Sequence, residues 1–244
     1  MGRLLRLAPL TFAFVLGACT SMGHEYQANR EQHEFGPRET LSVCLYVDNG
    51  INDEEARTLM ENAWRDEAPL YGLDVKIAQI KRWPRPAARM EGIMAALRKE
   101  QLEAPCDRVL ALIGRDFGDF MWSLLAPEYL GAVNTDTLTH GYAVARRVSL
   151  NQLISPPVDV TRHEIYHMLG CGEHNDMKKC YDQIALLKTW KREHESDFFP
   201  AWDFLSGRLL ASREAVNERI HGTDVRLAAR PEEKRAATSP KSDR

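Results

Sequence analysis

The apolar run 109–113 is the feature that most constrains how this chain can fold. It is continuous and flanked by charged residues, a pattern typical of a strand that is buried on both faces of a sheet. Upstream, the segments 41–47 and 73–77 alternate apolar and polar residues, as half-buried strands do. Segments with helical periodicity separate these strands. We therefore expect an α/β (α+β) fold with a mixed, twisted sheet and flanking helices.

Two helices are expected between these strands, and two shorter strands after them. The first helix begins after Asn52, a good N-cap with Glu55 at the capping-box position. Its apolar stripe consists of Ala56, Leu59, Met60, Ala63 and Trp64. The second helix is expected at 87–100. The short strands are expected at 130–133 and 142–146, which completes the sheet.

The first 18 residues have the pattern of an export signal. Arg3 and Arg6 give it a positive start, a short apolar stretch follows, and Leu-Gly-Ala precedes Cys19. This end resembles the lipobox of bacterial lipoproteins, whose cysteine is acylated and becomes the first residue of the mature protein. The resemblance implies a signal peptide at 1–18 and lipidation of Cys19. An ordinary cleaved signal with an incidental cysteine is the alternative.

A lipid anchor would hold the protein on a membrane. Without Arg3 and Arg6, 30 of the 32 basic residues remain against 35 acidic ones, a formal charge of −5. Charge would not attach such a domain to anionic lipid, so two or three acyl chains would have to carry the attachment. We expect the periplasmic face of the bacterial envelope. Thr20 replaces the aspartate that commonly retains lipoproteins at the inner membrane, which favours the outer membrane in a diderm cell.

The rest of the chain is expected to form one domain between two polar ends. Residues 19–38 show no periodicity and are expected to be a tether, while 39–225 form the domain. Beyond residue 180 we expect helical structure, because Ile184, Leu187 and Trp190 recur at helical spacing, as do Trp202, Leu205 and Leu209. The end, 226–244, is rich in Arg, Glu, Pro and Ser and is expected to be disordered. The formal charge of −3 gives no footprint for nucleic acid.

Four cysteines remain besides Cys19. An even number in an oxidising compartment indicates two disulfides, for which the sequence allows three connectivities. We favour Cys171–Cys180, a short clip after the helix described next, and Cys44–Cys106, which would join two segments adjacent to strands. Buried free thiols are the alternative.

His163 and His167 are the strongest chemical signal in the chain. They stand four residues apart in His-Glu-Ile-Tyr-His, so on a helix both imidazoles lie on one face and can reach one tetrahedral Zn²⁺. Glu164 follows the first histidine, where it can take a proton from water activated by the metal. The sequence therefore predicts a zinc site with Glu164 as general base.

The surroundings of this motif favour a helix that ends at a defined position. Pro156 and Pro157 are typical of a helix start, and Asp159 favours the first turn. Gly170 is expected to end the helix in the left-handed conformation, which would turn the chain back toward the metal. By helical spacing, Tyr166 faces away from the two histidines and is expected to lie in the core.

The segment 163–174, HEIYHMLGCGEH, resembles the signature of the metzincin zinc peptidases. Their usual third histidine stands three residues after the glycine, where this chain has Glu173, and His174 follows one position later. Snapalysin-like metzincins are similar in carrying an acidic ligand followed by histidine. This resemblance implies Glu173 as the third ligand. We favour His174 instead, because histidine is the better intrinsic ligand and the turn at Cys171 and Gly172 would absorb the one-residue shift. The metzincin resemblance also implies a metzincin-like sheet, and a polypeptide substrate that lies as an added strand along the edge 130–133.

Two features depart from related zinc peptidases. The region from 109 to the zinc helix is similar to archaemetzincins, but this chain lacks their cysteine-rich second metal site. Met177 is the only methionine after the motif and stands closer to it than the methionine turn of metzincins usually does. In gluzincins the third ligand is a glutamate on a later helix, for which Glu193 or Glu195 would qualify. Gly170 directly after the helix favours the metzincin geometry.

These residues predict a zinc-dependent endopeptidase of the cell envelope that acts on exported polypeptides. The alternative is a non-proteolytic lipoprotein that holds zinc in a structural or partner-binding site. Glu164 favours the peptidase, because a structural site has no need of a carboxylate beside its first ligand. His140 is expected to be an ordinary loop residue.

Overall fold

The computed structural model describes residues 30–31, 33–123, 129–146, 155–173 and 176–222. The expected signal peptide with Cys19, most of the tether, His174 and the expected tail therefore lie outside the described residues. None of the described helices is both long and apolar enough to cross a membrane.

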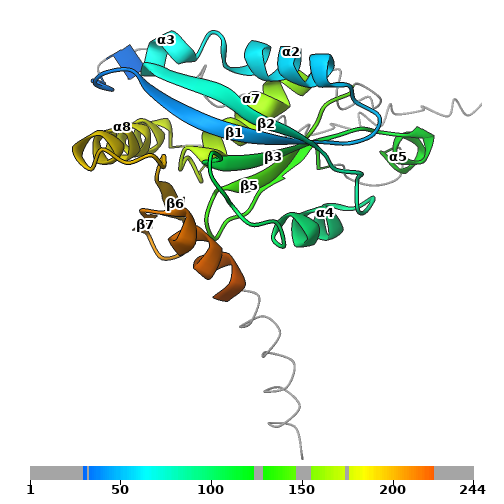
Figure 1. The fold of residues 1–244 in the computed structure, drawn as a ribbon. Coiled ribbons are helices and arrows are strands. Elements are labelled where there is room, and N and C mark those ends of the chain that lie inside the picture. The colour runs from blue at the N-terminus through cyan, green and yellow to red at the C-terminus, as the bar shows by residue number, and fades with distance from the viewer. Residues whose placement is uncertain (1–29, 32, 124–128, 147–154, 174–175, 223–244) are drawn as a thin grey trace, which may run out of the picture.

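A five-stranded mixed sheet forms the centre of the molecule (Figure 1), so the expected α/β fold class is confirmed. Its strands are β1 (Glu39–Val47), β2 (Leu73–Arg82), β3 (Arg108–Ile113), β4 (Gly131–Val133) and β5 (His140–Val144), in the order β2-β1-β3-β5-β4. The pairs β1–β2, β1–β3 and β3–β5 are parallel, whereas β4 pairs antiparallel with β5. The edge strand β4 is therefore the one strand of this sheet that runs against the others.

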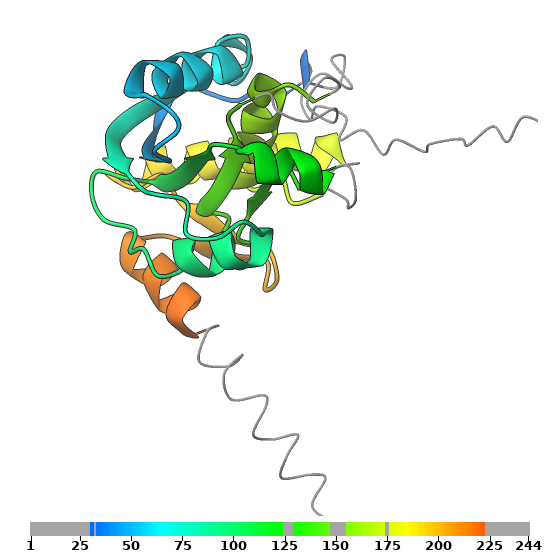
Figure 2. The ribbon, with the colours of Figure 1, turned by 90° about the vertical axis from the view of Figure 1, so that its right-hand side faces the viewer.

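Helices cover both faces of the sheet. They include α2 (Asp53–Trp64), α3 (Ala68–Tyr71), α4 (Met90–Leu97), α5 (Phe117–Ser123), α7 (Pro157–Met168) and α8 (Met177–Glu193). Both views place α2 on one side of the sheet, and α4 with the helical segment 213–222 on the other (Figure 1, Figure 2). Leu110 and Leu112 of β3 pack in the core under α2, α7 and α8, whereas Val109 and Ala111 pack in the second core. The expected central strand is thus buried on both faces.

Helix α2 forms as the sequence predicts. Asn52 accepts a hydrogen bond from the backbone N–H of Glu55, and the Glu55 carboxylate accepts one from the backbone of Asn52. The two bonds satisfy backbone donors that a helix start leaves without intrahelical partners. The five residues of the expected apolar stripe are the five buried residues of the helix.

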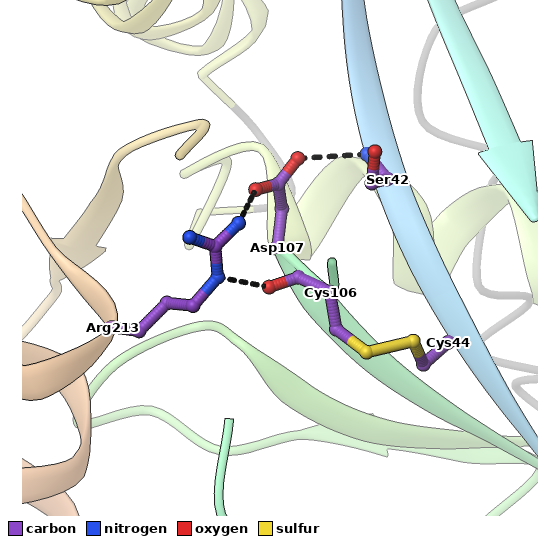
Figure 3. Close-up of a disulfide and its surroundings, with 5 residues drawn as sticks. All are labelled: Ser42, Cys44, Cys106, Asp107 and Arg213. Carbon is purple, nitrogen blue, oxygen red and sulfur yellow. Dashed lines mark hydrogen bonds and ion pairs between the residues drawn. A yellow bond between two sulfur atoms is a disulfide. The ribbon is translucent and has the colours of Figure 1, made fainter. Parts of the chain in front are cut away.

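Both expected disulfides are present. Cys44 of β1 is bonded to Cys106 before β3, and Cys171 after α7 is bonded to Cys180 of α8. Figure 3 shows the first of these bridges beside Arg213, which donates to the Cys106 carbonyl at 2.8 Å. The same guanidinium lies 3.3 Å from Asp107, whose other carboxylate oxygen accepts from the backbone N–H of Ser42 at 2.8 Å.

Helix α8 confirms the helix expected from Ile184, Leu187 and Trp190, but the segment after it differs from the expectation. Residues Ala201–Asp203 (β6) and Arg208–Leu210 (β7) form a two-stranded antiparallel hairpin, and helix resumes only at 213–222. The prediction from the spacing of Trp202, Leu205 and Leu209 is therefore wrong. A local turn decides against it, because the Asp203 carboxylate accepts the backbone N–H groups of Leu205 and Ser206 at 3.1 and 3.0 Å.

The expectation for His140 is also wrong. It is the first residue of β5 and is fully buried, with Nδ1 2.9 Å from the hydroxyl of Thr139. Burial lowers the pKa of His140 to about 4, so the folded protein holds this imidazole neutral at physiological pH.

Candidate metal centre

The expected motif lies on helix α7, which contains His163, Glu164 and His167. Pro156 is its N-cap and Pro157 its first residue, where the missing N–H leaves no intrahelical bond unmade. Nine of its twelve residues are buried, because it packs against α2 and against β4 and β5 of the sheet. The helix ends at Met168, and Gly170 follows with φ +94°, which confirms the expected glycine turn.

His163 and His167 converge on one face of α7. Their Nε2 atoms are 3.1 Å apart, and the ring planes are nearly perpendicular, at 82°. The Nδ1 of His167 is 2.7 Å from the carbonyl oxygen of Cys171. Because a carbonyl can only accept a hydrogen bond, this contact places the ring proton on Nδ1 and leaves a lone pair on Nε2. The two histidines are thus arranged as a pair of nitrogen ligands, one of them with a defined tautomer.

Glu164, which follows His163 on α7, is buried. Its residue surface is 3 % exposed, and the described part of the chain offers its Oε2 atom no hydrogen-bond partner. Burial raises the pKa of the Glu164 carboxyl well above its ordinary value, because desolvation disfavours the charged form. A cation held by the neighbouring imidazoles would oppose this effect and favour the carboxylate.

Gly131 of β4 makes room for the Glu164 side chain. A Cβ atom at position 131 would lie 2.3 Å from Oε1, 2.7 Å from Cδ and 2.8 Å from Cγ of Glu164. All three distances are shorter than van der Waals contact, so the carboxylate rests directly on the backbone of the edge strand. This contact could not be predicted from the sequence, because the two residues are far apart in the chain.

The opposite side of α7 is anchored in the core, as expected for Tyr166. Its hydroxyl donates to the buried carboxylate of Glu67 at 2.6 Å and is 2.8 Å from the hydroxyl of Tyr71. Arg30 and Arg162 lie 3.8 and 4.0 Å from the same carboxylate. Glu67 carries no recognisable sequence signal, since charged residues at the end of a helix are usually exposed.

A buried arginine fixes the C-terminal end of α7. Arg108 of β3 donates from Nε to the carbonyl of Met168 at 2.9 Å, and from its other nitrogens to the carbonyls of Phe199 and Pro200. A cation at this end of a helix also interacts favourably with the helix dipole. Burial lowers the pKa of Arg108 to about 10, which still leaves it charged near neutral pH. In the sequence it resembles an ordinary charge flanking a strand.

The candidate third ligands are not gathered around the two histidines. Glu173 is exposed, and its carboxylate pairs with Lys179 at 2.7 Å, while His174 lies outside the described residues. Glu193 and Glu195 are exposed at the far end of α8, about 20 Å along the helix axis from Cys180. Among the described residues, no three His, Cys, Asp or Glu side chains form a group that could hold a metal. Only the two histidines are therefore placed together, and Glu164 adjoins His163 in the chain.

Met177, the candidate for a methionine turn, is the first residue of α8. It is buried in the same core as Ile165 and Leu169 of the zinc-helix region. Its role beneath a metal stays a prediction.

The comparison with known proteins adds no family to these observations. No protein-family model matches the chain, and no curated protein matches it in sequence.

Proposed function

We propose that this protein is a zinc-dependent peptidase in which His163 and His167 bind the metal and Glu164 acts as general base. The observation that carries the proposal is the convergence of the two Nε2 atoms to 3.1 Å on a helix that also carries the buried Glu164. Imidazole nitrogens are preferred zinc ligands, and a tautomer fixed by a backbone carbonyl is typical of metal-binding histidines. Zinc also fits the Glu164 carboxylate, because a nearby cation stabilises its buried charge.

The residues of the chain divide the work of hydrolysis. When bound, zinc supplies Lewis-acid polarisation of water and of the peptide carbonyl. Glu164 accepts the proton of the attacking water and returns it to the leaving amine nitrogen. The hydrogen bond from His167 to Cys171 and the contact of Glu164 with Gly131 hold these groups in place. The burial of Glu164, which is 3 % exposed, keeps bulk water away from the proton transfer.

The edge strand β4 supports a polypeptide as substrate. It is the last strand in the sheet order, so an extended peptide can add to its outer side by main-chain hydrogen bonds. Because Gly131 of this strand touches Glu164, a peptide bound there would run past the proposed general base. This arrangement agrees with the substrate position implied by the metzincin resemblance.

We propose His174 as the third ligand, with Glu173 as its rival. Histidine is the better intrinsic ligand for zinc, and the Glu173 carboxylate is engaged by Lys179 at 2.7 Å. Zinc affinity, measured by competition with a chromophoric chelator, should fall more for His174→Ala than for Glu173→Ala. A loss confined to Glu173→Ala would instead assign the acidic ligand of the snapalysin-like pattern.

The test of the peptidase is a comparison of the wild type with Glu164→Gln. Zinc content and hydrolysis of unfolded casein are measured on the same samples, with the exposed Glu195→Gln as control. We expect zinc in all three proteins, and a loss of hydrolysis of about 100-fold or more only in Glu164→Gln. A wild type that holds no zinc would overturn the proposal.

A non-proteolytic zinc protein is the second candidate. The burial of His163 and Glu164, which are 7 % and 3 % exposed, favours it, because a closed site is typical of structural zinc. In that case all three proteins would hold zinc and none would hydrolyse casein.

We also propose that the protein is anchored to the periplasmic face of the envelope by lipid on Cys19, as the lipobox resemblance implies. Mass spectrometry of the mature protein should find acyl chains on Cys19, and Cys19→Ser should release the protein from membranes.

A further inference from the structure

Cys171 connects the histidine pair to α8 in two ways. Its carbonyl oxygen is 2.7 Å from Nδ1 of His167, and its sulfur is bonded to Cys180, with the two Cα atoms 4.6 Å apart. Both cysteines are 2 % exposed and belong to the core that contains α7 and α8. One residue therefore carries both the bridge and the carbonyl that orients a proposed metal ligand.

The position of this carbonyl is not set by the regular part of the helix. Helix α7 ends at Met168, and Gly170 turns the chain with φ +94° before Cys171. The backbone N–H of Cys171 still donates to the carbonyl of Tyr166 at 3.1 Å. The covalent bond to Cys180, which is buried within α8, ties the same residue to a second helix. The turn is thus held from two sides.

We infer that the Cys171–Cys180 disulfide is a positioning element of the proposed metal centre and that tight zinc binding requires it. The inference rests on the proposed function. Loss of the bridge lets the Cys171 carbonyl move, so His167 loses the contact that fixes its tautomer and ring direction. Such outer partners of metal-binding histidines typically contribute 10- to 100-fold to metal affinity. In the sequence, both candidate third ligands also lie between the two bridged cysteines.

The Cys44–Cys106 disulfide provides a matched control within the same chain. It joins β1 to the segment before β3 and belongs to the second core, on the other face of the sheet (Figure 3). Its cysteines are 62 residues apart in the sequence, against 9 for Cys171 and Cys180. A longer loop loses more chain entropy when it is closed in the unfolded state. This bridge should therefore contribute more to thermal stability and nothing to metal binding.

The experiment compares Cys171→Ala/Cys180→Ala with Cys44→Ala/Cys106→Ala in the full mature chain. Alanine removes the thiols, so the variants cannot bind zinc through sulfur. Zinc affinity is measured by chelator competition at a temperature at which circular dichroism shows both variants folded, and melting temperatures are measured on the same samples. We expect the first pair to lower zinc affinity 10- to 100-fold. The variant without Cys44 and Cys106 should keep the zinc affinity of the wild type within about twofold. Its melting temperature should fall at least as far as that of the first variant.

Equal zinc affinities of the two folded variants would overturn the inference. If the first variant does not fold, Cys171→Ala/Cys180→Val restores most of the buried volume and carries the same expectation. A wild type that binds no zinc contradicts the proposed function itself. A wild type that binds zinc, with a first variant that binds it equally well, contradicts only the role of the bridge.

Discussion

At the scale of single residues, the site combines groups that α7 itself carries with contacts that Gly131 and Arg108 make to this helix from two strands of the sheet. The sequence predicted His163, Glu164 and His167 on one helix that ends at Gly170, because all of these signals lie within a few turns. The sequence could not indicate Gly131 or Arg108, which meet α7 from distant strands. Contacts of this kind have no periodicity and become visible only once the sheet is assembled.

The contact between Gly131 and Glu164 gives the first prediction. A methyl group at position 131 would lie 2.3 Å from Glu164 Oε1, so Gly131→Ala must displace the buried carboxylate. A displacement of about 1 Å can lower a catalytic rate about 100-fold, whereas the two histidines are untouched. We expect kcat on casein to fall by this order with zinc content unchanged. The control is Gly50→Ala, where the added methyl group meets only an ordinary contact at 3.9 Å. If Gly131→Ala keeps the kcat of the wild type, the contact does not position Glu164.

The buried His140 gives a prediction on pH. Its folded-state pKa of about 4 lies below the value of about 6.5 in the unfolded chain. As the pH falls from 6.5 to 4, the unfolded chain takes up a proton that the folded protein does not, so the free energy of unfolding decreases. The decrease amounts to about 3 kcal/mol at pH 4. Denaturant unfolding should show that the free energy of unfolding of His140→Gln decreases less than that of the wild type between pH 6.5 and 4, by this amount. The exposed His194→Gln should follow the wild type. If the free energy of unfolding depends on pH in the same way in the wild type and both variants, the prediction is wrong.

At the scale of secondary-structure elements, prediction succeeded where the signal is local and unopposed. Helix α2 has a complete capping box and a matching apolar stripe, and both are present in the structure. Strand β2 was expected to end at residue 77 but continues to Arg82. The pairing with β1 shifts by one residue after Ile77, so the apolar alternation that marks a strand changes phase there and Ile80 falls out of the pattern.

The hairpin β6–β7 shows two local signals in conflict, and it gives the third prediction. The apolar spacing favours a helix, but Asp203 closes a turn and also accepts from Arg219 Nε at 2.6 Å. Asp203→Ala removes both contacts and should lower the free energy of unfolding by about 2 kcal/mol, measured by denaturant titration. Asp203→Asn keeps an oxygen for the turn and loses only the charge, so its loss should be smaller. Equal losses would show that the turn contributes little.

At the scale of the whole molecule, the domain begins earlier than the expected boundary at residue 39. Phe35 is 8 % exposed and packs edge-on against Tyr71, with ring centroids 4.9 Å apart. His33 lies 2.8 Å from the carboxylate of Asp182 on α8. A single buried ring in a polar stretch produces no periodicity, so this segment resembles a tether in the sequence. The segment is instead packed against the core behind the proposed metal helix.

This packing predicts that two truncated chains will differ in stability. A chain that begins at Glu39 lacks Phe35 and also Arg30, which lies 3.8 Å from the buried carboxylate of Glu67. Loss of a buried phenylalanine removes about 3 kcal/mol, and the Glu67 charge loses one of its compensating cations. Each kcal/mol shifts the melting temperature of a domain of this size by about 2–4 °C. The chain that begins at Glu39 should therefore melt about 10 °C below one that begins at Arg30, as calorimetry can measure. Phe35→Ala in the longer chain should account for most of the difference in melting temperature. Equal melting temperatures of the two truncated chains would show that residues 30–38 do not stabilise the domain.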